Sequence, residues 1–376
     1  MHLRGTHTRP TRLNQIKRSE FIKKSGFGLA VGVAASTLAV PAALAKKTFN
    51  WKMATSWPAG MPILETGAER FAKLVGELSN GDLTIEVSAS GELVPPLGVF
   101  DAASQGTIQC YHSASYYWAD KHPGTQWFTS VPFGMNSAGY NAWLHAGDGQ
   151  KLWDELYASF NLVPRPLGTT GYQMGGWFNK KIASMADLKG LKMRFPGLAG
   201  KVYSKAGASV VLLPGSQVYA SMENGTISAT DWVGPMLDMR MGLGRVAKYY
   251  YTPGWQEPTG FSEIVFNKTA YDSLPRHLQI ILDCAASTIT AVMLAEFDTQ
   301  NAQALAEIHK DPKVEITAFP QEVLDTFKKL SAEVLEEEAD KAPLARAIHD
   351  NYKAFMAQWL PWTQITDKDY FSRMQG

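Results

Sequence analysis

The sequence predicts an α/β protein of two similar lobes, joined by crossover strands and completed by a long C-terminal helix. The first observation is length, because the roughly 330 residues after position 45 exceed the usual size of one hydrophobic core. Hydrophobic periods typical of helices and of strands also alternate along the chain, as they do in βαβ units. Finally, the pattern of eleven residues recurs 119 positions further on, which indicates two related lobes.

The first 45 residues have the three parts of an export signal. Seven Lys or Arg lie between Arg4 and Lys24, against one acidic residue. An 18-residue apolar run, Phe27–Leu44, follows and ends in the small-x-small sequence Ala43-Leu44-Ala45. This order of charged region, apolar region and small-residue site predicts a signal peptide over residues 1–45, cleaved after Ala45.

Two alternatives stay open for this segment. A retained transmembrane anchor is disfavoured, because the apolar run is rich in Gly, Ala, Ser and Thr and is broken by Pro41. The stretch Arg18-Ser19-Glu20-Phe21-Ile22-Lys23 is similar to a twin-arginine signal that lacks one arginine, so the Tat export route stays open beside the Sec route.

Removal of the signal changes the charge balance. The whole chain carries 36 basic and 35 acidic residues, and 29 and 34 remain once the seven basic residues and Glu20 are removed. The resulting net charge near −5 argues against a nucleic-acid or anionic-membrane partner, since both need a basic surface. An anionic ligand would therefore be held by a local basic group.

The chain has two cysteines, Cys110 and Cys284. An oxidising compartment allows a disulfide between them, but two thiols make no framework and their spacing matches no metal motif. We expect buried free cysteines, because a free thiol packs as a small hydrophobic group.

The first elements after the signal alternate between helix and strand. A helix is predicted where apolar residues share one face, at Leu64, Ala68, Phe71 and Val75. A turn at 79–82 separates it from a strand of alternating polarity that begins at Leu83. A second helix near 97–105 and a strand from Thr107 complete a βαβ pattern.

The repeated stretch is Val99–Gln109, which aligns without a gap with Val218–Ser228. Valine, an aromatic residue and Gly-Thr-Ile fall at the same offsets in both copies. This pattern is typical of a helix that ends at a glycine and is followed by a strand. A chance match or a generic helix-to-strand junction is the alternative to two related lobes.

Polar and aromatic residues follow each copy. Tyr116, Tyr117 and Trp118 come after the first copy, and Asp231 and Trp232 come after the second. Ligands of open α/β sheets bind outside the carboxyl ends of the strands, so both groups are expected to face a cleft between the lobes.

The C-terminal part has a different pattern. From Gln321 to about Trp359 it is dense in Leu, Glu, Lys and Ala, with apolar residues at helical spacing, until Leu360-Pro361-Trp362 breaks the pattern. A long terminal helix of this kind either braces both lobes or reaches a second subunit, and the sequence leaves both open.

Enzyme motifs are missing from the sequence. G-x-S-x-G, G-x-G-x-x-G and H-E-x-x-H do not occur, and Gly200-Lys201 lacks the rest of a P-loop. A Ser/His/Asp set assembled in space stays open, because triads are not recognised by sequence position. We expect a binding protein and no enzyme activity.

The central segment holds the best candidates for ligand binding. Gly171–Trp177 places small residues around Gln173, and glycines let a backbone approach a ligand closely. Arg194 ends a predicted strand before Pro196, a place that suits bidentate capture of a carboxylate, although a surface arginine is the alternative. The aromatic stretch Tyr249–Glu257 is too crowded to be all core, and we expect it to cross between the lobes and wall a pocket.

Together these stretches resemble the DctP-like solute receptors of tripartite ATP-independent periplasmic (TRAP) transporters, above all the subgroup that binds 2-oxo acids or lactate with a metal ion. This resemblance implies a two-lobed periplasmic binding protein fold. Each motif is weak alone, and the ordered set is specific. The motifs are Ala114-Ser115-Tyr116-Tyr117, Val131-Pro132-Phe133-Gly134, Gln173-Met174-Gly175-Gly176-Trp177-Phe178, Leu188-Lys189-Gly190-Leu191-Lys192-Met193-Arg194, Gly225-Thr226-Ile227, Asp231-Trp232-Val233-Gly234-Pro235 and Tyr250-Tyr251-Thr252-Pro253-Gly254-Trp255.

The resemblance implies a role for each matching residue. Arg194 would fork onto the ligand carboxylate, and Tyr117 would lend its hydroxyl to the ligand. Gln173 would offer its side-chain oxygen to a metal ion, Asp231 its carboxylate and Trp232 its backbone carbonyl. Oxygen ligands of this kind suit Na⁺ or Ca²⁺.

Further ligand contacts are expected from Tyr116, Trp255 and Gln256, and here the chain departs from the family pattern. Asp231 stands where the oxo-acid receptors are expected to have Glu, and its shorter arm puts the identity of the ion in doubt. Gln256 stands where Trp is expected, which gives a more polar and roomier pocket and puts simple pyruvate binding in doubt.

The resemblance also implies an organisation and a function. Lobe I would hold residues 46–170 and about 258–315, and lobe II residues 171–257 and about 316–376. The protein would bind a small 2-oxo or 2-hydroxy monocarboxylate with a cation in the periplasm, deliver it to a membrane permease, and dimerise through its C-terminal helix. A periplasmic enzyme acting on a small carboxylic acid and an interaction protein without a small ligand are the alternatives.

Overall fold

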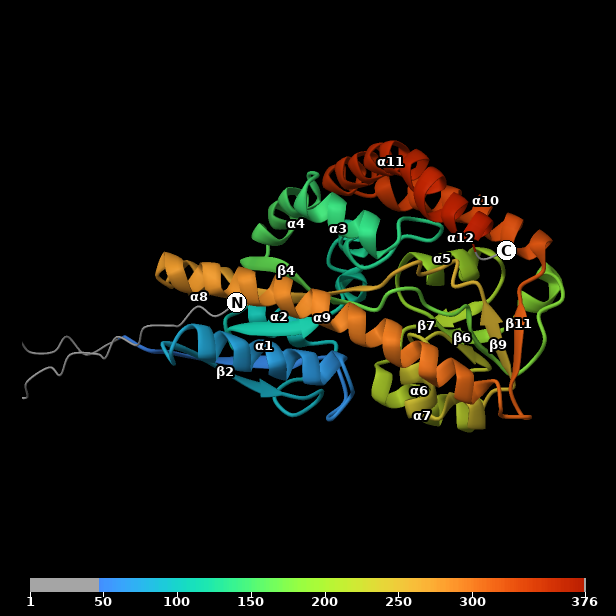
Figure 1. The fold of residues 1–376 in the computed structure, drawn as a ribbon, viewed down its shortest axis with the longest axis horizontal. Helices are drawn as coiled ribbons and strands as arrows, with labels where there is room; N and C mark the ends of the chain where they lie inside the picture. The colour runs from blue at the N-terminus through green and yellow to red at the C-terminus, as the bar shows by residue number, and fades with distance from the viewer. Residues whose placement is uncertain (1–46, 375–376) are drawn as a thin grey trace, which may run out of the picture. The chain divides into compact units, whose positions relative to one another are not determined.

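The structure is a computed structural model that describes residues 47–374, so the predicted signal peptide lies outside the described residues. These residues form a mixed α/β arrangement of two β-sheets flanked by helices, with long helices at the C-terminal end (Figure 1). The predicted fold class is confirmed.

The first sheet has the strand order β2-β1-β3-β10-β4. Its strand β1 is parallel to β2 and β3, whereas β10 is antiparallel to β3 and β4. Helices α1 and α2 pack against β2 and β3 respectively. The bounds are β1 Phe49–Thr55, β2 Leu83–Ser88, β3 Cys110–Ser113, β4 Leu162–Thr169, β10 Phe261–Asn267, α1 Leu64–Leu78 and α2 Val99–Ser104.

The second sheet repeats this topology. Its order is β7-β6-β8-β5-β9-β11, and from β7 onward the pairings are parallel, parallel, antiparallel and antiparallel, as in the first sheet. Strand β11 is added at the edge, parallel to β9. The bounds are β5 Gly176–Phe178, β6 Lys192–Arg194, β7 Ser209–Val211, β8 Ala229–Thr230, β9 Tyr249–Thr252 and β11 Glu315–Ala318.

The two copies of the repeated stretch occupy equivalent places in the two sheets. In each copy a helix, α2 or α6 (Gly215–Glu223), ends two residues before a glycine of positive φ, Gly106 at 77° or Gly225 at 76°. A residue without a Cβ adopts this left-handed conformation at low cost and ends the helix. The central strands β3 and β8 then follow. The repeat therefore marks two sheets of the same design.

The predicted N-terminal elements agree with the structure apart from one boundary. Helix α1 buries its predicted apolar face, and β2 begins at Leu83 after a turn with positive φ at Asn80 and Gly81. The strand predicted from Thr107 begins instead at Cys110, because the N–H of Thr107 still bonds to the oxygen of Ala102 in α2.

The chain crosses from the first sheet to the second between β4 and β5 and returns between β9 and β10. Helix α9, Arg276–Ile308, packs against α1 and β4 beside the first sheet and against α7, Pro235–Met241, which follows β8 (Figure 1). Its 33 residues span about 50 Å, so one helix reaches both sheets. By length and hydropathy α9 would also suit a membrane span, a property that buried core helices share.

The C-terminal segment forms two helices where the sequence predicted one. Helix α10, Gln321–Ala339, ends at Asp340, and α11, Pro343–Thr363, starts with a proline. Proline suits the first turn of a helix and not its interior, which explains the break at this point. The prediction that Pro361 ends the helix is wrong, because α11 includes Pro361 and continues into a π-helix over Gln364–Lys368.

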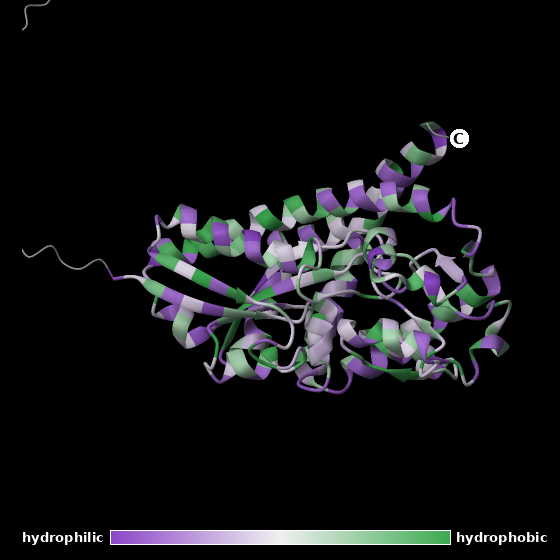
Figure 2. Ribbon diagram, turned by 90° about the horizontal axis from the view of Figure 1, so that it is seen from below, coloured by the Kyte–Doolittle hydropathy of each residue, from purple (hydrophilic) through white to green (hydrophobic). Residues whose placement is uncertain are grey.

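The final helix, α12 at Asp369–Met374, has no buried residue and stands clear of the neighbouring helices (Figure 2). Helix α10 packs against α5, whereas α11 packs against α3, α4 and the 3-10 helix at Pro123–Phe128. The lobe boundaries stay a prediction. The remaining bounds are α3 Ser137–His145, α4 Gly149–Ala158, α5 Gly197–Lys205 and α8 Lys268–Asp272, with 3-10 helices at Ser115–Trp118, Met185–Leu188 and Leu243–Arg245.

Both cysteines are free. Cys110 is buried in β3, as expected, whereas Cys284 is exposed on α9, so the expectation of a buried thiol is wrong for Cys284.

Candidate functional site

Arg194 lies in a group of buried polar side chains at the ends of the central strands. It is the last residue of β6 and is 1% exposed, so the surface-arginine alternative is wrong. Its Nη1 donates to the backbone oxygen of Asp231 at 2.9 Å, and its Nη2 donates to the hydroxyl of Tyr117 at 3.3 Å. The guanidinium lies 5.4 Å from the ring centre of Trp232, within cation–π range. A fixed positive charge is therefore held inside the protein.

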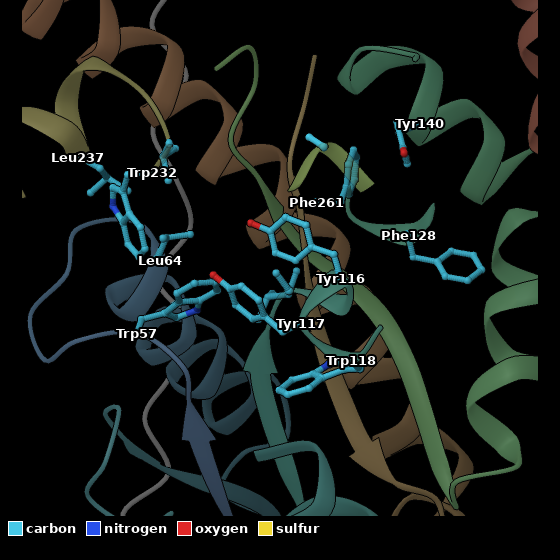
Figure 3. Close-up of a cluster of buried hydrophobic side chains, with 14 of the residues drawn as sticks. Trp57, Leu64, Tyr116, Tyr117, Trp118, Phe128, Tyr140, Trp232, Leu237 and Phe261 are labelled. Carbon is cyan, nitrogen blue, oxygen red and sulfur yellow. The ribbon is translucent and has the colours of Figure 1, made fainter. Parts of the chain in front are cut away.

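The phenols of Tyr116 and Tyr117 reach this group from the first sheet. Both residues lie in the 3-10 helix Ser115–Trp118 that follows β3, with ring centres 4.8 Å apart. Burial raises the pKa of each hydroxyl above its usual value, so both stay neutral hydrogen-bonding groups at neutral pH. Trp57, which follows β1, lies beside Tyr117, and Trp232 approaches the same space from the second sheet (Figure 3).

Gln173 lies in the crossing between β4 and β5. Its Nε2 donates to a carboxylate oxygen of Glu257 at 2.8 Å and to the hydroxyl of Thr170 at 3.2 Å. These acceptors fix the orientation of the amide and leave its Oε1 buried without a hydrogen-bond partner. A Cβ on Gly254 would come within 2.1 Å of the backbone oxygen of Gln173, so this glycine lets the two crossings approach closely.

Gln256 holds the carboxylate of Asp231 from the second crossing. Its Nε2 donates to Asp231 Oδ1 at 3.2 Å and to the backbone oxygen of Met174 at 2.6 Å. Asp231 Oδ2 and Gln256 Oε1 are both buried without a partner. Because the amide must present its donors to two acceptors, Gln256 Oε1 is the oxygen left free.

Two buried carboxyl groups share this space with one guanidinium. Burial raises the pKa of Asp231 and of Glu257, and the charge of Asp231 raises that of Glu257 further. The charge of Arg194 acts in the opposite direction on both groups. One more positive charge among these oxygens would favour the ionised carboxylates.

The donor set fits a hard cation. Gln173, Asp231 and Gln256 each present a buried oxygen that lacks a hydrogen-bond donor. Amide and carboxylate oxygens are the ligands of Na⁺ and Ca²⁺, whereas His and Cys select transition metals. Within residues 47–374 no three His, Cys, Asp or Glu side chains gather in a metal-binding cluster, which argues against a zinc-type site.

A narrow cavity adjoins these groups, and residues from both sheets line it. Tyr116, Tyr117, Gln173 and Trp232 lie in its wall. Arg194, Asp231 and Gln256 are not part of that wall; Arg194 contacts the wall residues Tyr117 and Trp232, and Gln256 bonds to Asp231. Trp255 does not line the cavity. Its ring stacks on Phe327, with centres 4.2 Å apart, and on Phe133, with centres 5.3 Å apart.

Two further wall residues, Trp57 and Glu257, received no role from the sequence. The signals for them were present. Glu257 ends the aromatic stretch that was expected to wall the pocket, and Trp57 follows β1 just as Tyr116 follows β3. The Nε1 of Trp57 donates to buried His112 at 2.9 Å.

Known proteins share this fold and much of this sequence. The family model of bacterial extracellular solute-binding proteins, family 7 (DctP), matches residues 53–341. A monocarboxylate 2-oxoacid-binding periplasmic protein of Nostoc is 40% identical over 321 residues, which cover 85% of this chain and 88% of that protein.

Two solved structures agree closely. A TRAP periplasmic solute-binding protein of Pseudoalteromonas atlantica, with bound sodium and pyruvate, is 40% identical with a TM-score of 0.85 and covers 87% of this chain and 99% of its own. A second, from Bordetella bronchiseptica, is a mixed-occupancy dimer with copurified calcium and picolinate; it is 36% identical, has a TM-score of 0.84 and covers 86% and 96%. The chain belongs to family 7 of the bacterial extracellular solute-binding proteins, the DctP-like receptors of TRAP transporters.

Proposed function

We propose that this protein binds a small monocarboxylate together with Na⁺ or Ca²⁺ and delivers it to a TRAP membrane permease. The observation that carries the proposal is the buried Arg194 beside three buried oxygens without partners, on Gln173, Asp231 and Gln256. An anion alone would leave those oxygens unsatisfied and would add a negative charge to the carboxyl groups of Asp231 and Glu257. An anion and a cation bound together offset each other's desolvation.

The ligand carboxylate is assigned to Arg194. Its Nη1 and Nη2 donate to the backbone oxygen of Asp231 and the hydroxyl of Tyr117, and this orientation of the guanidinium toward oxygen acceptors supports the assignment. Tyr117 and the neighbouring Tyr116 supply neutral hydroxyls at the cavity wall, and the indole of Trp232 covers the guanidinium. Water exclusion by these rings strengthens each charged contact.

The cation is assigned to Gln173 Oε1, Asp231 Oδ2 and the backbone carbonyl of Trp232. A bound cation would supply the positive charge that lets a second ligand oxygen remain buried. Gln256 holds Asp231 in place through a hydrogen bond, and we assign its buried, unpartnered Oε1 to the ligand. Trp255 is assigned a supporting place outside the cavity wall, through its stack with Phe133 and Phe327.

The ligand class is a 2-oxo or 2-hydroxy monocarboxylate. An oxygen next to the carboxylate allows one small acid to reach both Arg194 and the cation. The Pseudoalteromonas receptor holds pyruvate and the Bordetella receptor picolinate, so the family accommodates acids of different size. Gln256 places an amide where a larger indole is expected, which favours a polar or longer acid over a purely apolar one.

We propose binding without turnover. The family model and the Nostoc relative describe binding proteins. The family is described as extracellular and that relative as periplasmic, which supports a periplasmic location for this chain. The rival function is a periplasmic enzyme acting on the same acid. Incubation of the protein with the acid and analysis for product separates the two.

We also propose a homodimer formed through the C-terminal helix. From Trp362 onward five large apolar side chains are exposed among polar ones, which is unusual for a surface that meets only water. The Bordetella relative is described as a dimer. The exposed residues are Trp362, Ile365, Tyr370, Phe371 and Met374.

Thermal unfolding tests the function. Protein dialysed against EDTA in a sodium-free buffer is heated with 2-oxo and 2-hydroxy acids, in the presence of Na⁺, Ca²⁺ or neither. A ligand present at 100 times its Kd should stabilise the folded protein by about 2.7 kcal/mol. The shift should need both acid and cation. Absence of a shift with every acid under either cation would refute the proposal.

A further inference from the structure

A second buried carboxyl group lies behind the site. Asp238, on α7, is 1% exposed and is absent from the cavity wall. Its Oδ1 accepts a hydrogen bond from the backbone N–H of Val233 at 3.1 Å. Its Oδ2 accepts from the indole N–H of Trp177 at 3.0 Å and from the hydroxyl of Tyr250 at 2.7 Å. All three donors are themselves buried.

These donors belong to the three segments that carry the unpartnered oxygens of Gln173, Asp231 and Gln256. Val233 follows Asp231 and Trp232 after β8. Trp177 lies in β5, four residues after Gln173, and Tyr250 lies in β9, which leads into Gln256 and Glu257. The rings of Trp177 and Tyr250 stack with centres 4.0 Å apart, so their two donors reach the same carboxylate oxygen.

We propose that Asp238 is a positioning residue that holds these three segments in register, so that their oxygens converge on one cation. The inference rests on the proposed function. Burial of a carboxyl group is costly, and burial raises the pKa of Asp238 to about 6. A group used only for packing would be replaced by an apolar side chain without that cost.

The hydrogen-bond pattern shows why a carboxylate is needed here. The N–H groups of Val233 and Trp177 can only donate, and they bond to different oxygens of Asp238. An asparagine has one oxygen and one NH₂ group, so in either orientation its NH₂ would face one of these donors. Asp238→Asn must therefore release either the Val233 segment or β5.

Glu263 in β10 is the matched control, because it is a buried carboxyl group with a different set of donors. Its Oε1 accepts from Tyr111 at 2.8 Å and Trp118 at 2.6 Å, and its Oε2 accepts from the Tyr157 hydroxyl at 2.8 Å. A phenol hydroxyl can also accept, so the NH₂ of a glutamine would bond to Tyr157 while its oxygen keeps the other two donors. Glu263→Gln should preserve the local geometry.

The test compares Asp238→Asn with Glu263→Gln. Calcium and pyruvate are the probes, and lactate replaces pyruvate if the parent protein prefers it. The affinity for calcium in saturating acid is measured by isothermal titration calorimetry, and Tm is recorded for each variant. We expect Asp238→Asn to weaken calcium binding about ten-fold or more, since a buried donor loses its acceptor. Glu263→Gln should stay within about two-fold of the parent.

A purely structural role of Asp238 would lower the Tm of Asp238→Asn and leave its calcium affinity unchanged, and that result would overturn the inference. If Asp238→Asn does not fold, Tyr250→Phe takes its place, because it removes one donor and keeps the ring stack. Tyr250→Phe should weaken calcium binding about three-fold or more, and unchanged affinity would count against Asp238. A parent protein that binds no acid or cation would refute the proposed function instead.

Discussion

The hydroxyl of Tyr117 lies 3.3 Å from the guanidinium of Arg194. Tyr117 follows strand β3 of the first sheet, whereas Arg194 is the last residue of β6 in the second sheet. This contact joins the two halves of the site at the position assigned to the ligand carboxylate. Contact between the halves and recognition of the anion therefore depend on the same pair of side chains.

Removal of the Tyr117 hydroxyl should weaken ligand binding without loss of folding. Tyr117→Phe keeps the ring in the aromatic wall and removes one partner of Arg194. The expected cost is about 1 kcal/mol in the binding free energy, typical of one hydrogen bond. Calorimetric titration with the preferred acid measures it. Tyr219→Phe, which removes a hydroxyl bonded to Glu223 at an exposed place, is the control and should bind as the parent does.

Replacement of Arg194 should abolish measurable binding of the acid. Arg194→Ala removes the buried guanidinium charge that offsets the charge of the ligand. Arg194→Lys keeps the positive charge but loses the planar guanidinium. We expect a loss of about 3 kcal/mol or more for alanine and a smaller loss for lysine. Exposed Arg240→Ala tests for a general effect of lost charge. Unchanged affinity in Arg194→Ala would remove the assigned anion site.

Replacement of Gln256 should lower the affinity for the cation more than the affinity for the acid. Gln256→Ala leaves Asp231 Oδ1 and the oxygen of Met174 without their donor, so the carboxylate loses its fixed orientation. Calcium affinity in saturating acid should fall by about 1–3 kcal/mol. Exposed Gln321→Ala serves as the control. Equal loss of affinity for acid and cation would assign Gln256 to the ligand carboxylate instead.

The stability of the protein should fall between weakly acidic and basic pH because of Glu263. Burial raises its folded-state pKa to about 7, above the usual value of 4.5. The folded protein therefore holds this proton more tightly, and the resulting stability is present below pH 4.5 and is lost as pH rises through about 7. The shift corresponds to at most about 3 kcal/mol. Urea unfolding at pH 5 and pH 8 should show a smaller pH difference in Glu263→Gln than in the parent.

The C-terminal segment should determine the oligomeric state. Ile365→Asp together with Phe371→Asp replaces two of the exposed apolar side chains of the segment with charges. We expect the dimer to dissociate, because charges at an apolar interface lose hydration. Light scattering after size exclusion measures the mass. Ligand affinity should persist, and a double variant that remains dimeric would place the interface elsewhere.

The elements that could be predicted from the sequence have a regular hydrophobic period and clear turn or helix-ending residues at their boundaries. Helix α1 has a strict apolar face, and the repeated helix-glycine-strand unit appears in both sheets. Helix α9 was missed because its own apolar residues are spread over most of its circumference. Such a helix lacks the single apolar face by which a helix is recognised in a sequence. The break between α10 and α11 was missed because the helical composition continues across Pro343.

The site was predicted in part for similar reasons. Arg194, Asp231 and Trp232 stand at strand ends, where the topology itself directs side chains toward a cleft. Asp238 has no such position. Its proposed role comes from its long-range partners Trp177 and Tyr250, and no local pattern encodes these contacts.

Helix α9 has a mechanical consequence for ligand entry. Helix α9 contacts β4 and α1 beside the first sheet and α7 beside the second. The two sheets therefore do not hinge on flexible linkers alone. Separation must either flex the backbone of α9 or make it slide over one of its neighbours. A continuous helix resists bending. Opening would therefore raise the elastic energy of α9, and closing would release it. Opening of the site to admit the acid would then require work against this helix.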